Sequence, residues 1–351
     1  MGVDSGSEAW PQCSRAIACF FRRKPGLRGE YWTFPPAPPK SSRFEERDVT
    51  AWIRAQRALN GSAVTLLVLT AAMWGANGVV SRAAVGEVPP LTLVTLRWLV
   101  VCGLLLPFLR GKLRKAAPVL RARKTYLVLM ALCGYTGFNV LFYLAGSRTS
   151  AVNIVLLQGA IPATVLAIGA LFKGLPATPL QIAGMGLSFS GAGLIATHGD
   201  IFALGAFSLN VGDAMMLAAC VLYALYTVAL RERPPLAPLV FFSGMAIAAF
   251  VESLPFFAWE IASGGFFWPT PKGWAFVLFV ALFPSLISQI FFMRAVELIG
   301  PGRAGIFTNL TPLFGALFAI SLLGEPFHAY HAAAMILGLS GIALAEWGGR
   351  K

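Results

Sequence analysis

Charged side chains are scarce in this chain of 351 residues, of which Asp, Glu, Lys and Arg make up 12%. Soluble domains carry about 25% charged residues. Apolar residues account for 57% of the chain, and the mean hydropathy is +0.71. A soluble domain would leave part of this apolar surface in water, so the composition argues against an ordinary soluble protein and indicates a membrane protein.

Signatures of catalysis are missing as well. The chain holds 3 histidines, and it has no His-Glu-x-x-His zinc motif, no paired aspartates on a helix and no clear Ser/His dyad. It also lacks a Gly-x-x-x-x-Gly-Lys-Ser/Thr loop, so ATP-driven transport would need another subunit. We therefore expect no enzyme, no cofactor and no metal, although an intramembrane enzyme stays open as an alternative.

The 5 cysteines form no recognisable disulfide framework. Cys13 and Cys19 precede the apolar part of the chain, whereas Cys102, Cys133 and Cys220 fall inside apolar runs. We expect free thiols.

Long apolar runs follow one another along the chain. They occupy 58–81, 88–109, 125–147, 149–172, 174–197, 214–230, 234–251, 273–293, 304–324 and 326–345, with Arg97 as the one interruption by a charge. A helix that spans a bilayer needs about 20 mostly apolar residues. The sequence therefore predicts an all-α membrane protein with ten transmembrane helices.

The net charge of +13 is unevenly distributed. Lys and Arg crowd residues 15–57 and 110–124, whereas alternate loops hold few beyond Arg82, Arg148 and Lys272. Cytoplasmic loops carry such an excess, so we expect a plasma (inner) membrane protein with both termini in the cytoplasm. The basic charge then faces anionic lipid and no nucleic acid.

Residues 1–57 are basic and rich in proline, with YWTFPPAPPK at 31–40. This composition is typical of a disordered segment, and we expect a disordered cytoplasmic tail.

The two halves of the apolar region repeat one pattern. When Pro162 is aligned on Pro312, the same offset pairs Asn139 with Gln289. Repeats of this kind indicate duplicated structural units.

We assign residues 58–200 to a first five-helix repeat and 208–348 to a second. Because five is odd, the second repeat enters the membrane from the opposite side. Inverted repeats around a site at the membrane midplane are a common transporter architecture, whereas a receptor or scaffold predicts none. We expect a secondary transporter, in the export direction, for small organic metabolites such as amino acids; whether it forms a homodimer is open.

Several short motifs occur in a fixed order. They are WGAN (74–77), TLRW (95–98), TSA (149–151), Gly-Asp (212–213) and TPLFGALFAISLLGE (311–325). With this order and spacing the chain resembles the drug/metabolite transporter superfamily in its EamA-type form, over about residues 58–348. The resemblance implies ten helices in two repeats and a transport function. Leu175 departs from the pattern, because the family tends to have a glutamate there.

Polar and aromatic side chains inside the apolar runs are candidates for a substrate site, because polar groups in lipid tend to face a cavity or another helix. The candidates are Trp74, Asn77, Asn139, Tyr143, Gln158, Tyr223, Tyr226, Gln289, Phe292 and Asn309. The alternative is that each one bridges helices structurally.

Pro162 and Pro312 are hinge candidates, because proline removes a helical hydrogen bond. Such a break can free carbonyls for a ligand or create a flexing point, and a static kink is the alternative.

Two charges are candidates for substrate binding or ion coupling. Arg97 could bind a substrate carboxylate, pair with Glu252, or extend toward the membrane interface. Glu252 could carry a coupling proton, or it could be an interfacial acid.

Glu325 stands between Gly324 and Pro326. We expect it to cap the start of the helix that follows it, with a gate contact as the alternative. His328 and His331 follow at spacings of three; a metal or pH-sensing role is open, but interfacial histidines need no ligand.

Overall fold

The architecture is taken from a computed structural model that describes residues 62–173, 178–197, 199, 210–299 and 307–348. The chain divides after Gly61, and all of these residues belong to the unit Ser62–Lys351. The tail expected at residues 1–57 lies outside the described residues.

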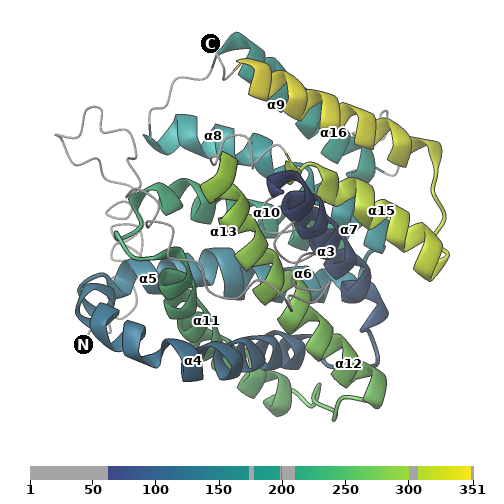
Figure 1. The fold of residues 1–351 in the computed structure, drawn as a ribbon. Helices are drawn as coiled ribbons and strands as arrows, with labels where there is room; N and C mark the ends of the chain where they lie inside the picture. The colour runs from purple at the N-terminus through teal and green to yellow at the C-terminus, as the bar shows by residue number, and fades with distance from the viewer. Residues whose placement is uncertain (1–61, 174–177, 198, 200–209, 300–306, 349–351) are drawn as a thin grey trace, which may run out of the picture. The chain divides into compact units, whose positions relative to one another are not determined.

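The described residues form helices and no β-strand (Figure 1). The first half contains α3 (Ala63–Ala83), α4 (Pro90–Ala122), α5 (Lys124–Ala131), α6 (Gly137–Gly146), α7 (Ala151–Gln158), α8 (Ile161–Lys173) and α9 (Pro179–Ala196). The second contains α10 (Val211–Ala229), α11 (Pro238–Ala262), α12 (Pro271–Val280), α13 (Ser288–Ile299), α15 (Leu310–Leu323) and α16 (Ala329–Gly348). Single π-helical turns, η1 (Leu132–Thr136) and η4 (Ala281–Ile287), join α5 to α6 and α12 to α13.

Seven helical segments in the described part are long and apolar enough to cross a membrane. They are Ala63–Ala83, Pro90–Ala122, Lys124–Gly146, Ala151–Phe172, Val211–Ala229, Pro238–Ala262 and Pro271–Val296. Helix α15 has 14 residues, which at the α-helical rise amount to about 21 Å, less than the hydrocarbon thickness. The predicted count of ten spans is thus not established by helix length.

Several helices begin at a residue whose side chain caps them. The Ser150 hydroxyl accepts a hydrogen bond from the backbone N–H of Asn153 at 3.0 Å, at the start of α7. Ser62 and Thr270 cap α3 and α12 in the same way. A hydroxyl at this position satisfies a backbone donor that the helix leaves without a partner. Helix α15 ends at Gly324, whose φ of 65° suits a glycine that terminates a helix.

The helices of the two halves correspond in order. Under the Pro162–Pro312 alignment, η1 falls on η4 and α9 falls on α16. A π-helical turn is rare in proteins. Its presence at matching places in both halves shows that the sequence repeat has a structural counterpart.

Helices α3, α7 and α15 cross at close range because small residues line the crossing. A Cβ atom on Gly75 would lie 2.6 Å from the backbone nitrogen of Gly315. Val155 of α7 occupies the space beside Gly78 and Gly315. This crossing ties one segment of the second half to two of the first.

Helices α9 and α16 run side by side (Figure 1). A Cβ on Gly184 would lie 2.4 Å from the Gly341 carbonyl oxygen, and one on Gly191 would lie 2.7 Å from the Ala334 carbonyl oxygen. Small residues permit such backbone contact between membrane helices.

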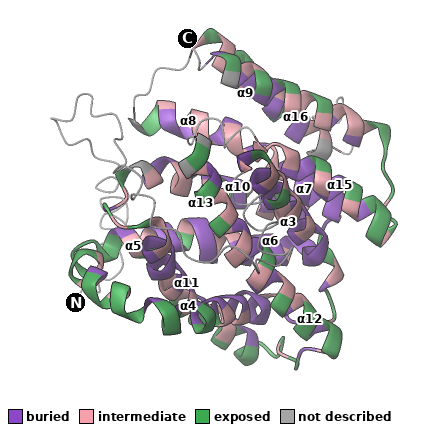
Figure 2. Cartoon of the chain, viewed as in Figure 1, coloured by how far each residue is buried: buried purple, intermediate pink, exposed green. Residues whose placement is uncertain are grey.

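Burial follows the interior of the helix assembly, and the part of α4 beyond Leu109 is largely exposed (Figure 2). Large apolar side chains also face outward, including Phe108 at 85% exposure and Leu171 at 79%. Lipid is the solvent that suits such a surface.

Candidate functional site

Arg97 of α4 is the centre of a buried polar cluster, with a residue exposure of 5%. Its Nη1 donates to Asn139 Oδ1 at 2.6 Å and to Tyr143 Oη at 3.1 Å. Its Nε donates to Ser285 Oγ. The cluster therefore joins α4 and α6 of the first half to η4 of the second, at a place closed to solvent in this conformation.

Asn77 of α3 extends this cluster, because its Oδ1 accepts a hydrogen bond from the Tyr143 hydroxyl at 2.7 Å. On the same helix, Trp74 Nε1 donates to Ser288 Oγ at 3.0 Å. The ring of Trp74 lies 5.6 Å from that of Phe292. Five of the predicted candidates thus lie on α3, α6 and α13 around or beside Arg97 and the π turn.

The π turn η4 explains how Ser285 reaches Arg97. Pro284 lies within this turn, and a π turn widens a helix and redirects its side chains. The Ser285 hydroxyl donates to the Val280 carbonyl, five residues earlier, while its oxygen accepts from Arg97. The apolar run at 273–293 predicted a helix here, but it did not predict the π turn.

Aromatic rings surround the guanidinium. Its central carbon lies 5.4 Å from the ring centroid of Trp98 and 5.9 Å from that of Tyr143. Trp98 stacks on Tyr135 at 4.9 Å. Ring faces attract a cation at such distances, so these contacts add to the hydrogen bonds of Arg97.

The predicted tyrosines of α10 continue this aromatic wall. Tyr223 and Tyr226 have ring centroids 5.4 Å apart. Tyr226 lies 5.7 Å from Tyr135, and Tyr223 lies 5.2 Å from Phe138. Helix α10 thereby supplies apolar ring surface near the Arg97 cluster.

Glu252 of α11 does not pair with Arg97, so that expected alternative is wrong. Both carboxylate oxygens of Glu252 are buried and accept no hydrogen bond within the described ranges. Arg97 also does not extend to the interface, because Ser285, Asn139 and Tyr143 hold its Nε and Nη1 inside the helix assembly. The two buried charges are therefore separate features.

Three other candidates do not join the cluster. Gln158 ends α7, Gln289 lies on α13 and Asn309 precedes α15; each is half-buried. The described part of the chain offers no hydrogen-bond partner to these side chains.

Pro162 and Pro312 lie in the first turns of α8 and α15, just after breaks at 159–160 and 308–309. Proline fits a first turn, where its missing N–H is not needed. The α-helix is thus interrupted by two residues just before each proline. A Cβ on Gly159 would lie 3.6 Å from Pro312, so the two breaks adjoin each other.

Acidic residues meet helix starts at one end of the helices. Glu325 Oε1 and Oε2 accept from the backbone N–H groups of Ala151 and Val152, each at 2.9 Å. The expected cap of its own following helix is therefore wrong, since Glu325 caps α7 instead. We call this end, which holds the α3–α4, α6–α7 and α15–α16 connections, the carboxylate end.

Glu260 makes a similar contact that sequence reasoning missed. Its oxygens accept from the backbone N–H groups of Leu91 at 3.0 Å and Thr92 at 2.7 Å, at the start of α4. An acid in the last turn of a helix opposes that helix's own dipole. An acid in the last turn of a predicted helix is thus the sequence signal that could have indicated a partner for Glu260 on another helix.

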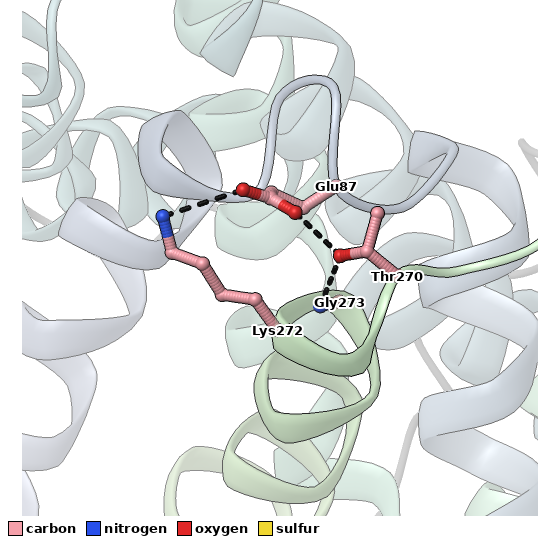
Figure 3. Close-up of polar contacts among 4 residues, drawn as sticks. All are labelled: Glu87, Thr270, Lys272 and Gly273. Atoms are coloured by element: carbon pink, nitrogen blue, oxygen red, sulfur yellow. Dashed lines mark hydrogen bonds and ion pairs between the residues drawn. The ribbon is translucent and has the colours of Figure 1, made fainter.

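A further set of polar contacts lies at the carboxylate end (Figure 3). Lys272 Nζ lies 3.3 Å from Glu87 Oε1. The Thr270 hydroxyl donates to Glu87 Oε2 and accepts from the Gly273 N–H. The hydrogen bond from Thr270 is the main cause that lowers the pKa of Glu87, and Lys272 adds to it.

A cavity of about 170 Å³ lies beside Glu325, with Asn153, His328, Tyr330 and His331 among its lining residues. Asn153 Oδ1 lies 3.2 Å from His331 Nε2, and Nδ1 of His331 accepts from the backbone N–H of His328 at 3.1 Å. The histidines are thus engaged within the protein. No group of three metal-ligating side chains occurs among the described residues.

Comparison with known proteins assigns the family. The EamA-like transporter family matches residues 61–197 and again residues 210–347. An uncharacterized transporter of Archaeoglobus fulgidus is 26% identical over 298 residues, covering 82% of this chain and 98% of its own. The uncharacterized transporter YyaM of Bacillus subtilis is 23% identical over 232 residues, covering 65% of this chain and 74% of its own.

The uncharacterized inner membrane transporter YicL of Salmonella typhimurium is 26% identical over 81% of this chain and 95% of its own length. A solved crystal structure with 18% sequence identity matches with a TM-score of 0.56, over 81% of this chain and 96% of the other, which shows a shared fold. With two family matches and several apolar helices of spanning length, this chain is a multi-pass membrane protein that belongs to the EamA-like transporter family.

Proposed function

We propose that the protein is a secondary transporter that exports small organic metabolites, with amino acids as the first class to test. It alternates access to a site between two inverted repeats of five helices. The observation that carries this proposal is the Arg97 cluster, because it is buried and draws its members from both halves. A site between two halves is opened to either side when one half moves against the other.

The matching helices support the repeat as the unit of motion. When α5 is counted with α6, α7 with α8 and α12 with α13, the described part of the chain has five helical segments in each half, as two five-helix repeats would require. The concentration of basic residues at 110–124 favours an orientation with cytoplasmic termini. In this orientation the carboxylate end faces outward.

The contacts at the carboxylate end are the proposed outer gate. Glu87, Glu260 and Glu325 each connect segments that are distant in the sequence. These contacts are hydrogen bonds and an ion pair confined to this end of the helices, so water can replace them when the end opens. The adjoining breaks before Pro162 and Pro312 are the proposed flexing points.

Flux into proteoliposomes tests the proposal. The full chain is reconstituted and offered labelled amino acids, organic acids, choline-like cations and nucleosides, with and without a pH gradient and without ATP. Saturable flux of at least one class above protein-free liposomes is expected. The absence of flux for every class would contradict a transport function. The direction of transport is then measured in cells that make the protein, where uptake without any efflux of the solute would contradict export.

A further inference from the structure

The guanidinium of Arg97 has neutral partners. Its hydrogen-bond acceptors are the Ser285 hydroxyl, the side-chain oxygen of Asn139 and the Tyr143 hydroxyl. No acid of the described ranges forms an ion pair with it. A buried cation is costly in a membrane unless an anion compensates its charge, so this site favours an anionic ligand.

Arg97 also has donors to spare. A guanidinium carries five N–H groups, one on Nε and two on each Nη. Ser285 engages Nε, while Asn139 and Tyr143 engage Nη1. The two N–H groups of Nη2 have no acceptor among the described residues. These donors can bind a carboxylate oxygen, and the existing bonds fix the plane of the group.

A zwitterion would also need a partner for its ammonium group. Glu325 and Glu260 are bound to helix starts at the carboxylate end. Asp213 accepts from Thr149 at 2.6 Å, at the start of α7. Glu252 has no contact with the cluster. The aromatic rings of Trp98 and Tyr135 instead offer apolar surface.

We infer that the Arg97 site binds organic monocarboxylates with an apolar or aromatic body, in preference to zwitterionic amino acids. This inference rests on the proposed transport function and, among small organic metabolites, puts monocarboxylates in place of amino acids as the expected substrates. A monocarboxylate would neutralise Arg97, whereas a zwitterion would leave the buried site with a net positive charge.

Matched probes separate the charge classes. We would measure binding to the purified full chain in nanodiscs for 3-phenylpropionate, phenylalanine and phenethylamine, and for 4-methylpentanoate, leucine and 3-methylbutylamine. At least one carboxylate should bind about tenfold tighter than its amino acid, and its amine should not compete. Equal or tighter binding of the amino acid or amine in both series, or binding of neither carboxylate, would overturn the inference.

Flux of the same probes separates this inference from the proposed function. Transport of an amine or amino acid without any carboxylate binding overturns the carboxylate site and leaves the transporter standing. Carboxylate binding without flux of any probe supports the site and contradicts transport.

Variants then locate the binding to Arg97. Arg97→Gln should weaken carboxylate binding by about tenfold to a hundredfold, and Arg97→Lys should restore part of it. Arg110→Gln removes an exposed arginine from the same helix and should leave binding unchanged. Unchanged carboxylate affinity in folded Arg97→Gln would overturn the assignment; if that variant does not fold, the ranking of the probes on the native chain remains decisive.

Discussion

Glu325 Oε2 accepts a hydrogen bond of 2.9 Å from the backbone N–H of Val152, 173 residues earlier in the chain. Its other oxygen accepts from Ala151. One carboxylate of the second half therefore satisfies two donors that the start of α7 would otherwise leave open.

Replacing Glu325 with Gln should destabilise this contact. The amide keeps one acceptor oxygen and loses the negative charge at the helix start, so the free energy of unfolding should fall by about 1 kcal/mol. Thermal unfolding in detergent measures the change. Ser321→Ala serves as the control, because the exposed Ser321 hydroxyl bonds within its own helix. Equal stability of Glu325→Gln and the native chain would contradict the cap.

Glu87 predicts a dependence of stability on pH. Thr270 and then Lys272 lower the pKa of Glu87 in the folded protein. Because the pKa of Glu87 is lower in the folded protein than in the unfolded chain, its ionised carboxylate stabilises the fold at pH values above the unfolded pKa. This stabilisation is lost as the pH falls through the folded pKa. The unfolding midpoint of the native chain should therefore exceed that of Glu87→Gln near pH 7, and the difference should shrink in acid. A difference that grows in acid would contradict this sign.

Two glycines of α9 form a matched pair for testing the α9–α16 contact. A Cβ on Gly184 would collide with the Gly341 carbonyl, whereas one on Gly186 would meet no atom within 4 Å. Gly184→Ala should lower the free energy of unfolding by about 1–3 kcal/mol, because the helices must separate. Gly186→Ala should be neutral or slightly stabilising. An equal change in the free energy of unfolding for the two variants would contradict the packing.

Glu252 predicts a pH effect on transport. Its buried oxygens lack hydrogen-bond partners within the described ranges, which suits a carboxylate that takes up and releases a proton. Glu252→Gln should abolish the stimulation of flux by a pH gradient in proteoliposomes. Flux without a gradient is the control. Unchanged activity and unchanged pH dependence would rule out coupling through Glu252.

Much of the helix layout could be predicted from the sequence. The apolar runs predict long helices, and the alignment of Pro162 with Pro312 predicts that the two halves correspond. Arg97 could be singled out, because a charge inside an apolar run needs a reason. These features depend on local composition and on repetition, which a single sequence displays directly.

Long-range contacts could not be predicted in the same way. The π turn that turns Ser285 toward Arg97 leaves no clear pattern in the residues, and an expected Arg97–Glu252 pair ignored which faces of α4 and α11 carry them. The cap from Glu325 to α7 depends on how distant segments meet at the carboxylate end. Leu175, where the family tends to have a glutamate, lies outside the described residues.

The central claim is that the carboxylate end must open for transport. It is tested most directly by linking Glu87 and Thr270 at that end, since the backbone N–H of Thr270 donates to the Glu87 carbonyl at 2.9 Å. Glu87→Cys and Thr270→Cys are combined in a chain whose native cysteines are replaced, and flux of the probe solutes is measured before oxidation, after it and after reduction. Alternating access predicts that the cross-link stops flux and that reduction restores it. Undiminished flux through the fully cross-linked protein would contradict the account.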